Sequence, residues 1–494
     1  YREIGNRKGE TNAIRGLAQV ALLLARYDDA ADRFEQARAI YREIGDRQGE
    51  ASGIEGLGHV ARVLGRNDEA TVHYGEALDI YRQIRDRRGE ASCIEGFADV
   101  AWMVGRYTEA AARYYEALRV ARAIDFRRGE ASCIEGLGHV ALMLARHDDA
   151  DDYYRKALTI HRKIEFRRGE ANCIRGIGEV ARVRGRYGDA ADYFEQALAI
   201  YQCIGHRRGK ADSIRALGNV DRQQGRDDRA AERYQEALAV YREIGHRRGQ
   251  IGCLVGLGEV DLKGTRYKDA EGRYKEALAL CLEIGDRWNE ANSIRVLGDV
   301  DWELARYNQA ADHYREALEI CREIGDQLGE TTFIWSLGDV DLKEARYNKA
   351  AGRYQETLAL GREIGDRWSE ANSIRALGNV YWMQARYDEA AGSYRRARFI
   401  YRQVDDRYME AECLVACGRL YATTDPVSAR DDLIEASRIF TSVGQPDRAE
   451  ALKREAASFA TSLTPRSPSS LLPSGTPLAA HGDLGRWLDE RRRL

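Results

Sequence analysis

The sequence predicts an all-α protein, an α-solenoid built from antiparallel helix pairs. A unit of 40 residues recurs ten times in register between residues 9 and 408. All six prolines lie at or after Pro426, so the preceding residues lack the strongest helix breaker. Such a period is typical of arrays in which each helix pair packs only on its neighbours, so the length of the chain does not imply several separate cores.

Each unit contains two helical patterns joined by short turns. The first has apolar residues at i, i+3, i+6 and i+10 and runs into an arginine that is present in all ten units. We expect this arginine in the last turn, where a positive charge favours the helix dipole. The second helix often closes on Ile-Gly-Asp, with Gly as C-cap and Asp capping the next helix. Two residues after the arginine we expect the N-cap of the second helix: Asp28, Asp68, Thr108, Asp148, Asn308 and Asp388.

Small and aromatic residues alternate as closely packed helices require. Gly or Ala recurs within the first helix, as at Gly58 and Gly138, and Ala within the second, as at Ala30 and Ala70. A glycine inside a helix costs up to about 1 kcal/mol relative to alanine, so its recurrence indicates close packing. An aromatic residue, expected in the core, occupies one place in every unit: Phe34, Tyr74, Tyr114, Tyr154, Phe194, Tyr234, Tyr274, Tyr314, Tyr354 and Tyr394.

The unit resembles the tetratricopeptide repeat. The resemblance covers roughly residues 1–457 and implies a right-handed superhelix of helix pairs. The unit departs from the usual form of about 34 residues with a closing proline, because Arg402 or its equivalents replace the proline and the second helix is longer. This long form is similar to the repeats of Pins-type adaptors and of STAND ATPase sensor regions. The motif is seen at Ile374, Leu377, Gly378, Tyr381, Ala385, Tyr387, Ala390, Tyr394 and Ala397.

The ends of the array differ from its middle. Residues 1–8 match the end of a repeat, so we expect a fragment of a longer array, with ten repeats over residues 9–408. Residues 409–457 read as a divergent last repeat, whose second helix is opened by Asp425 and Pro426, followed by a capping helix over residues 447–457. Residues 458–480 form a Pro- and Ser-rich linker, and residues 481–494 a short amphipathic helix. The apolar face of this helix consists of Leu484, Trp487 and Leu488. We expect this face to dock either on a partner protein or in the groove of the same chain.

Composition excludes several functions. Lys and Arg number 77 against 80 Asp and Glu, a net charge of -3, which gives no bulk attraction to nucleic acid or to an anionic membrane. No apolar run approaches the roughly 20 residues needed to span a bilayer. Cysteines alternate with serine in the repeats, which favours helix packing in a reducing cytoplasm. Cys413 and Cys417 share a helical face, and packing is favoured over a metal site because no histidine stands near them.

In the family that the units resemble, the first helices line a concave groove. Counted from the residue after Gly-Glu, the second, fifth, ninth, twelfth and thirteenth places face inward. The fifth place holds Glu55, Glu95 and Glu135 early and mainly arginine later. Arg and Trp are typical of protein-binding hot spots, although neighbouring charges that pair along a solvated face remain the alternative. The residues predicted to contact a partner are Arg175, Arg215, Asn219, Arg295, Asp299, Trp302, Trp335, Asp339, Arg375, Asn379 and Trp382.

Two further patterns have a structural and a functional interpretation. An aspartate ladder at Asp221, Asp261, Asp301 and Asp341 could hold a cation, but pairing with basic groups of adjacent helices is favoured. Phe126, Phe166, His206 and His246 replace the linker aspartate, which is either a second contact surface or drift. His59 and His139 are taken as surface histidines. No catalytic set, cofactor loop or metal-ligand spacing stands out.

The sequence therefore predicts a cytoplasmic, non-enzymatic scaffold that binds a protein or peptide in its groove. The main alternative is the ligand-sensor arm of a larger STAND-type signalling ATPase. An RNA-binding solenoid is disfavoured because no basic stripe repeats. Self-association through exposed repeat ends stays open.

Overall fold

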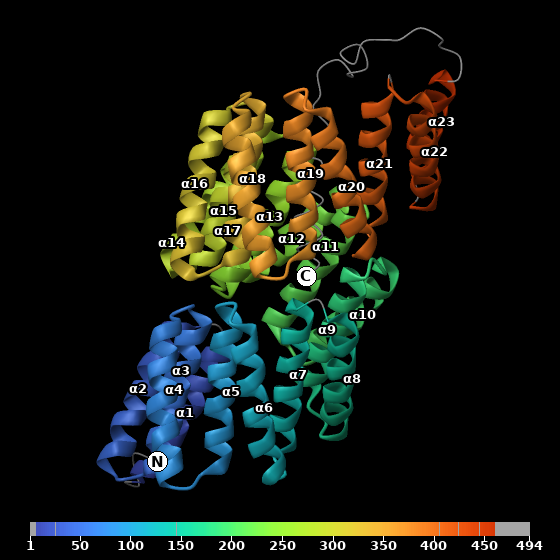
Figure 1. The fold of residues 1–494 in the computed structure, drawn as a ribbon. Helices are drawn as coiled ribbons and strands as arrows, with labels where there is room; N and C mark the ends of the chain where they lie inside the picture. The colour runs from blue at the N-terminus through green and yellow to red at the C-terminus, as the bar shows by residue number, and fades with distance from the viewer. Residues whose placement is uncertain are drawn as a thin grey trace. The chain divides into compact units, whose positions relative to one another are not determined.

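The chain folds into helices alone. In the computed structural model the described residues are 6–24, 26–144, 146–404, 406–422, 424–443 and 445–459, and these form 23 α-helices and no strand (Figure 1). This confirms the predicted all-α fold class. The described residues fall into two compact units, the first up to Ser293 and the second from Ile294 onward.

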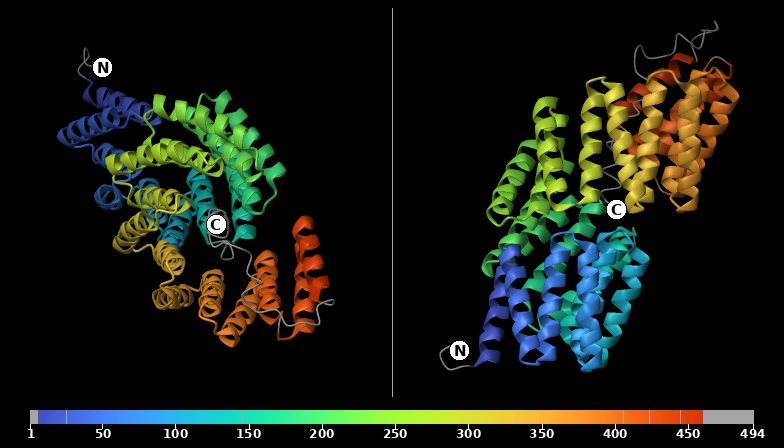
Figure 2. Two further views of the ribbon diagram at one scale, coloured as in Figure 1. Left: turned by 90° about the horizontal axis from the view of Figure 1, so that it is seen from above. Right: turned by 90° about the vertical axis from the view of Figure 1, so that its left-hand side faces the viewer.

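The helices alternate as first and second members of pairs, seen side by side within each unit in Figures 1 and 2. The first helices are α1 (Arg7–Leu23), α3 (Arg47–Val63), α5 (Arg87–Met103), α7 (Arg127–Met143), α9 (Arg167–Val183), α11 (Arg207–Gln223), α13 (Arg247–Lys263), α15 (Arg287–Glu303), α17 (Gln327–Lys343) and α19 (Arg367–Met383). The second helices are α2 (Tyr27–Glu43), α4 (Asn67–Gln83), α6 (Tyr107–Ala123), α8 (His147–Lys163), α10 (Tyr187–Cys203), α12 (Asp227–Glu243), α14 (Tyr267–Ile284), α16 (Tyr307–Ile324), α18 (Tyr347–Glu363) and α20 (Tyr387–Gln403). Three helices follow: α21 (Arg407–Tyr421), α22 (Pro426–Ser442) and α23 (Pro446–Phe459).

The first helices form the inner side of each unit. Successive first helices contact one another repeatedly, as α3 contacts α5 and α5 contacts α7 in the first unit, and α17 contacts α19 in the second. Contacts of that extent between successive second helices do not occur among the described residues. Helices that approach their next-nearest neighbours lie on the concave side, so α1, α3, α5 and their successors line the groove.

Local capping sets where the first helices begin. Asp46 accepts a hydrogen bond from the Gly49 backbone N–H at 3.0 Å, and Asp86, Asp326, Asp366 and Asp406 cap in the same way. These caps confirm the linker aspartates as N-caps. Gly45, Gly325 and Gly365, which precede three of these caps, take the predicted left-handed conformation, with φ of 69°, 71° and 74°. Arg85, before Asp86, takes it as well, with φ of 58°.

The prediction for the second helices was wrong by two residues. The recurring arginine is not in the last turn of the first helix but at the N-cap of the second, as Arg66 is in α4, with no side-chain capping bond. The predicted caps lie inside the first turn, because only three residues connect the helices. There the carboxylates of the four aspartates interact favourably with the positive end of the helix dipole. In five repeats the arginine instead pairs with a carboxylate three residues on, as Arg146 does with Asp149 at 2.7 Å. The correction applies to Asp28, Asp68, Thr108, Asp148, Asn308 and Asp388.

The aromatic ladder forms the core, as predicted. Tyr74 and Tyr154 are fully buried. A Cβ atom on Gly58 would lie 2.9 Å from the Tyr74 ring, and one on Gly96 in the next repeat 2.7 Å from it. The ring therefore lies between the first helices of two successive repeats. It occupies the space that a side chain at either glycine would fill. Each repeat locks to its neighbour through one ring.

The aspartate ladder pairs with arginines, as predicted. Asp261 lies 2.8 Å from the Arg266 Nη2 atom, the arginine of the helix turn, and 2.5 Å from Arg273 Nε of the second helix. Asp221 and Asp341 have the same two partners in their repeats, and Asp301 pairs with Arg306 and His313. These carboxylates hold the two helices of one repeat together, which accounts for them without a cation.

Candidate functional site

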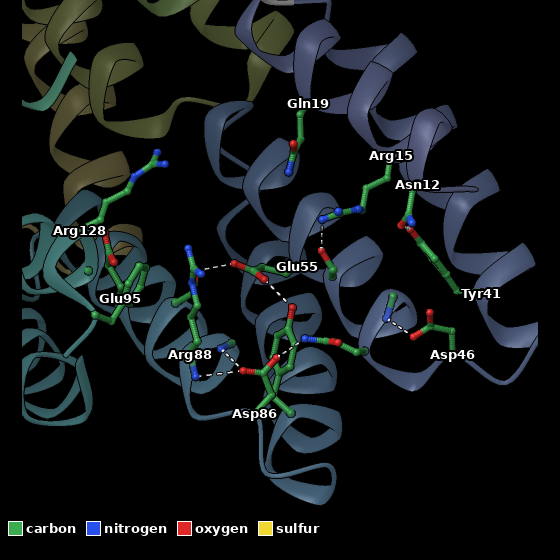
Figure 3. A pocket seen from close by; sticks show the side chains of 18 of the residues that line it. Asn12, Arg15, Gln19, Tyr41, Asp46, Glu55, Asp86, Arg88, Glu95 and Arg128 are labelled. Carbon is green, nitrogen blue, oxygen red and sulfur yellow. Dashed lines mark hydrogen bonds between the residues drawn. The ribbon is translucent and has the colours of Figure 1, made fainter. Parts of the chain in front are cut away.

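The groove of the first unit contains a cavity of about 570 Å³. Its polar wall comes from four successive first helices, α1, α3, α5 and α7, as Figure 3 shows for Arg15, Glu55 and Glu95. The second and fifth places of the repeat supply most of this wall, and Gln19 of the ninth place adds to it. The lining includes Asn12, Arg15, Gln19, Ser52, Glu55, Ser92, Glu95 and Ser132, with Arg88 and Arg128 at the helix starts.

Neighbouring repeats are tied together along this wall. The Arg15 Nη1 atom donates to Ser52 Oγ at 2.9 Å, and Tyr41 donates to Asn12 Oδ1 at 2.6 Å (Figure 3). Tyr81 donates to the Glu55 carboxylate at 2.8 Å. Second- and fifth-place side chains are therefore both groove lining and links between helices.

Three fifth-place glutamates differ in their surroundings. Burial acts to raise the pKa of Glu55, but its neighbours His59, Ser92 and Tyr81 hold that pKa below its usual value. Glu95 has no hydrogen bond or ion pair with any described residue. Burial first, then the nearby Asp99 and Glu135 carboxylates, raise the pKa of Glu95 to about 8. Glu95 is thus a half-buried carboxyl group that lines the cavity and forms no ion pair with a described residue, although the Arg62 charge acts to lower its pKa.

Glu135 is the most strongly ionised of the three. Burial acts to raise the pKa of Glu135, but His139 and His161 hold that pKa at about 2. The Asn172 side-chain amide also donates to Glu135 Oε1 at 3.1 Å. The same repeat position therefore holds carboxylates in three different states.

The fifth-place arginines of the first unit are incompletely satisfied. The Nε atoms of Arg15, Arg175 and Arg215 are buried and have no hydrogen-bond partner among the described residues. Burying a donor without a partner costs about 1–3 kcal/mol, so native structures rarely leave one. These three donors are suited to acceptors supplied by a ligand.

The ninth place has a structural role that the sequence analysis missed. His59 and His139, taken as surface residues, are half-buried and hydrogen-bonded to Tyr74 and Tyr154 at 2.9 and 2.7 Å. A buried phenol needs an acceptor, and the ninth place provides it. Phe194 has no hydroxyl, and the ninth place of its repeat holds Glu179. The other pairs are Tyr114–Asp99, Tyr234–Asn219, Tyr314–Asp299, Tyr354–Asp339 and Tyr394–Asn379.

The predicted contact residues divide by unit and by burial. In the first unit Arg175, Arg215 and Asn219 are half-buried on α9 and α11. In the second unit Asn379 and Trp382 are half-buried on α19. The remaining six are buried. Arg295 is paired with Asp299 at 2.5 Å, and the Trp335 indole nitrogen has no hydrogen-bond partner within the described part of the chain. The six are Arg295, Asp299, Trp302, Trp335, Asp339 and Arg375.

Substitutions at the linker keep or lose the helix cap according to their chemistry. His206 and His246 accept from the Gly209 and Gly249 backbone N–H groups at 2.9 and 3.0 Å. Burial, followed by nearby arginines, lowers the pKa of His206 to about 4 and that of His246 to about 3, so both rings are neutral acceptors. Phe126 cannot cap, and the Arg88 guanidinium carbon lies 4.4 Å from the centre of its ring.

The cysteines are core residues with one exception. All nine are free, and Cys413 and Cys417 are buried in apolar clusters, as the packing interpretation predicts. Cys203 is exposed. Cys173 lies beside Glu135 and His161, a grouping that the sequence analysis missed because its members lie on three helices.

Comparison with known proteins agrees with the helix geometry. The tetratricopeptide repeat model matches residues 50–123, 130–202, 170–243, 250–323 and 330–403. The chain belongs to the tetratricopeptide repeat family. It is a repeat scaffold, and members of this family are generally non-catalytic. No curated protein is similar enough to count as a relative.

Several solved structures share the fold at low identity. A Rap protein complexed with Competence and Sporulation Factor is 14% identical, with 73% of this chain and 97% of that chain covered and a TM-score of 0.46. A signal transduction ATPase with a tetratricopeptide repeat sensor from Pyrococcus horikoshii is 14% identical, with 72% and 52% covered and a TM-score of 0.46. The quorum sensor NprR from B. thuringiensis is 13% identical, with 74% and 99% covered and a TM-score of 0.43. These likenesses concern the fold alone.

Two predictions concern other parts of the chain. None of the described helices combines the length and apolar character that crossing a bilayer requires. The predicted docking residues Leu484, Trp487 and Leu488 lie outside the described residues, as does nearly all of the linker.

Proposed function

We propose that this repeat scaffold binds an extended segment of a partner protein along the first helices of its groove. One observation carries the proposal: Arg15, Arg175 and Arg215 present buried Nε donors to which no described residue offers an acceptor. An extended peptide offers backbone carbonyl groups, and acidic side chains offer carboxylates, which guanidinium groups bind well. The repeat spacing would distribute such contacts along the ligand.

Glu95 adds selectivity to this proposal. It lines the cavity and has no hydrogen bond or ion pair with any described residue, so a ligand lysine or arginine placed beside it would supply the missing positive charge. The favoured ligand therefore combines a basic side chain facing α5 with acceptors facing α9 and α11. A segment that lacks the basic side chain would leave the Glu95 carboxyl group protonated or uncompensated.

The eleven predicted contact residues remain part of the proposal. Arg175, Arg215 and Asn219 would act in the first unit, and the residues from Arg295 to Trp382 in the second, where the unpaired Trp335 indole N–H could donate to a ligand. The tail residues Leu484, Trp487 and Leu488 are proposed as a docking peptide. The nine free cysteines fit a reducing cytoplasm, where we place this non-enzymatic function. A sensor arm of a signalling ATPase would use the same groove.

The test uses substitutions that the chain itself tolerates at the same repeat position. Arg215→Val introduces the residue found at Val255, and Arg229→Val on the exposed face of α12 is the matched control. An array of extended peptides identifies the best ligand, and its affinity is then measured by isothermal titration calorimetry. We expect Arg215→Val to weaken binding at least tenfold, and Arg229→Val to leave it unchanged.

A charge reversal tests the selectivity. Glu95→Lys should shift the preference of the array from basic to acidic residues at one ligand position. Equal binding by Arg215→Val and the unaltered chain, together with an unchanged preference in Glu95→Lys, would remove the groove of the first unit as the binding site.

A further inference from the structure

Three side chains from three successive helices of the first unit converge on one point. They are Glu135 of α7, His161 of α8 and Cys173 of α9, and one ligand atom of each lies within 4.8 Å of the others. His161 Nε2 lies 3.6 Å from Glu135 Oε2, and Cys173 Sγ lies 3.9 Å from the same oxygen. We propose that Glu135 Oε2, His161 Nε2 and Cys173 Sγ bind a zinc ion.

The distances between these atoms suit ligands around one ion. Zinc binds oxygen and nitrogen at about 2.0–2.2 Å and sulfur at about 2.3 Å, so tetrahedral ligands lie roughly 3.3–3.6 Å from each other. The two separations from Glu135 Oε2 exceed this by no more than a few tenths of an ångström, and His161 Nε2 and Cys173 Sγ lie within 4.8 Å of each other. A direct hydrogen bond between imidazole and carboxylate would bring nitrogen and oxygen to about 2.7–2.9 Å, which 3.6 Å does not meet.

The histidine is buried without a hydrogen-bond partner. His161 is fully buried, and neither ring nitrogen has a hydrogen-bond partner among the described residues. A Cβ atom on Gly169 would lie 2.5 Å from the ring, so the ring rests against the backbone of α9 and is held in place. Buried histidines normally use at least one nitrogen, and an ion at Nε2 would satisfy this one.

The repeat supplies its own comparison for the site. Two units earlier, the same three positions hold Glu55, Tyr81 and Cys93. There the Tyr81 hydroxyl donates to Glu55 Oε2 at 2.8 Å and fills the space beside the carboxylate. Histidine is shorter than tyrosine, so its ring stops before the carboxylate. An ion beside Glu135 would stand where the hydroxyl oxygen stands beside Glu55.

Neighbouring groups orient the carboxylate. Asn172 donates to Glu135 Oε1 at 3.1 Å, and its own oxygen accepts from Tyr201 at 2.6 Å. The Oε1 atom is thereby engaged, and Oε2 is the oxygen nearest His161 and Cys173. Second contacts of this kind fix the orientation of metal ligands in known sites.

The ligand set favours zinc among common divalent ions. One sulfur, one imidazole nitrogen and one carboxylate oxygen suit a borderline-soft ion, whereas magnesium and calcium prefer oxygen ligands only. A dication also balances one carboxylate and one thiolate. Glu135 is the partly exposed member, so the ion would enter from the groove.

The test measures zinc bound to the full chain after removal of metal with a chelator. Bound zinc is determined by mass spectrometry after dialysis, and Co²⁺ serves as a spectroscopic probe for a thiolate ligand. We expect one zinc per chain and a thiolate-to-cobalt charge-transfer band. His161→Tyr and Cys173→Ser should each weaken zinc binding at least a hundredfold, and Cys173→Ser should abolish the band.

Matched controls separate this site from general thiol binding. Cys133→Ser changes the equivalent cysteine one repeat earlier, beside Ala121, and should bind zinc as the unaltered chain does. Both serine substitutions repeat what the chain has at Ser213, so folding is preserved and is checked by circular dichroism. The proposal is overturned if the unaltered chain binds no zinc at micromolar concentration, or if Cys173→Ser and Cys133→Ser behave alike.

Discussion

The repeat that contains Glu55 and the repeat that contains Glu135 share a backbone and differ in chemistry. Both place the fifth-place carboxylate beside a cysteine of the next repeat, Cys93 or Cys173. The residue that contacts the carboxylate from the second helix differs: Tyr81 in one repeat, His161 in the other. The Tyr81 hydroxyl donates directly to the Glu55 carboxylate, whereas His161 Nε2 lies 3.6 Å from Glu135 Oε2. One register position decides whether the groove carboxylate is a structural acceptor or a candidate ligand.

The intervening repeat completes the comparison. It has Ala121 at the same position, and its Glu95 receives no donor from the second helix. The pKa values follow this order, lowered at Glu55, raised to about 8 at Glu95 and lowered to about 2 at Glu135. Repeats with the same backbone can therefore give the carboxyl group at one groove position different surroundings and a different pKa.

The largest expected effect on stability comes from removing the buried aromatic ring that every repeat shares. Tyr154→Ala removes a fully buried ring that separates two first helices. Removing a buried aromatic side chain costs about 3–5 kcal/mol. Chemical denaturation should show this loss, while Tyr187→Ala at a more exposed position serves as control. A loss below about 1 kcal/mol would mean that the ladder does not hold the repeats together.

The second expected effect is on the pH dependence of stability, which should differ between Glu95 and Glu55. The pKa of Glu95 is raised above its ordinary value of 4.5 to about 8, so its stabilising contribution is present below 4.5 and is lost as pH rises to about 8. Glu95→Gln should therefore be more stable than the unaltered chain at pH 9 by about 1–3 kcal/mol, and equally stable near pH 4.

Glu55→Gln should behave in the opposite way. The pKa of Glu55 is lowered, so its contribution is present above 4.5 and is lost as pH falls through the lowered pKa. The denaturation midpoints of the two variants, measured across pH, test these opposite pH dependences. Parallel profiles would contradict the opposite pKa shifts of Glu95 and Glu55.

The smallest effect concerns the linkers. Asp86→Ala removes an N-cap that accepts from two backbone N–H groups and should cost about 1 kcal/mol. Phe126→Ala, at the equivalent place, loses no cap. It loses the contact of its ring with Gly129 and the contact with Arg88, the latter worth about 0.5–1 kcal/mol at an exposed site. Thermal melts of the two variants should keep this order, and a reversed order would show that Phe126 is the stronger anchor.

Local and periodic features could be predicted from the sequence. The aromatic ladder, the glycine contacts and the Asp261–Arg266 pair follow from a fixed period, because every repeat imposes the same neighbours. The start of the second helices was missed, since the short connection leaves no room for a cap after the arginine. The Glu135–His161–Cys173 cluster depends on how α7, α8 and α9 pack in three dimensions. Its one signal in the sequence was a histidine at a position that usually holds tyrosine.

The most direct measurement exchanges the two deciding residues in one chain, Tyr81→His together with His161→Tyr. Zinc stoichiometry and the cobalt spectrum are then measured with Cys93→Ser or Cys173→Ser added. The account predicts that one zinc still binds and that binding now depends on Cys93 and no longer on Cys173. Binding that still depends on Cys173, or that is lost in the exchanged chain, would contradict the claim that this register position decides the chemistry of the groove carboxylate.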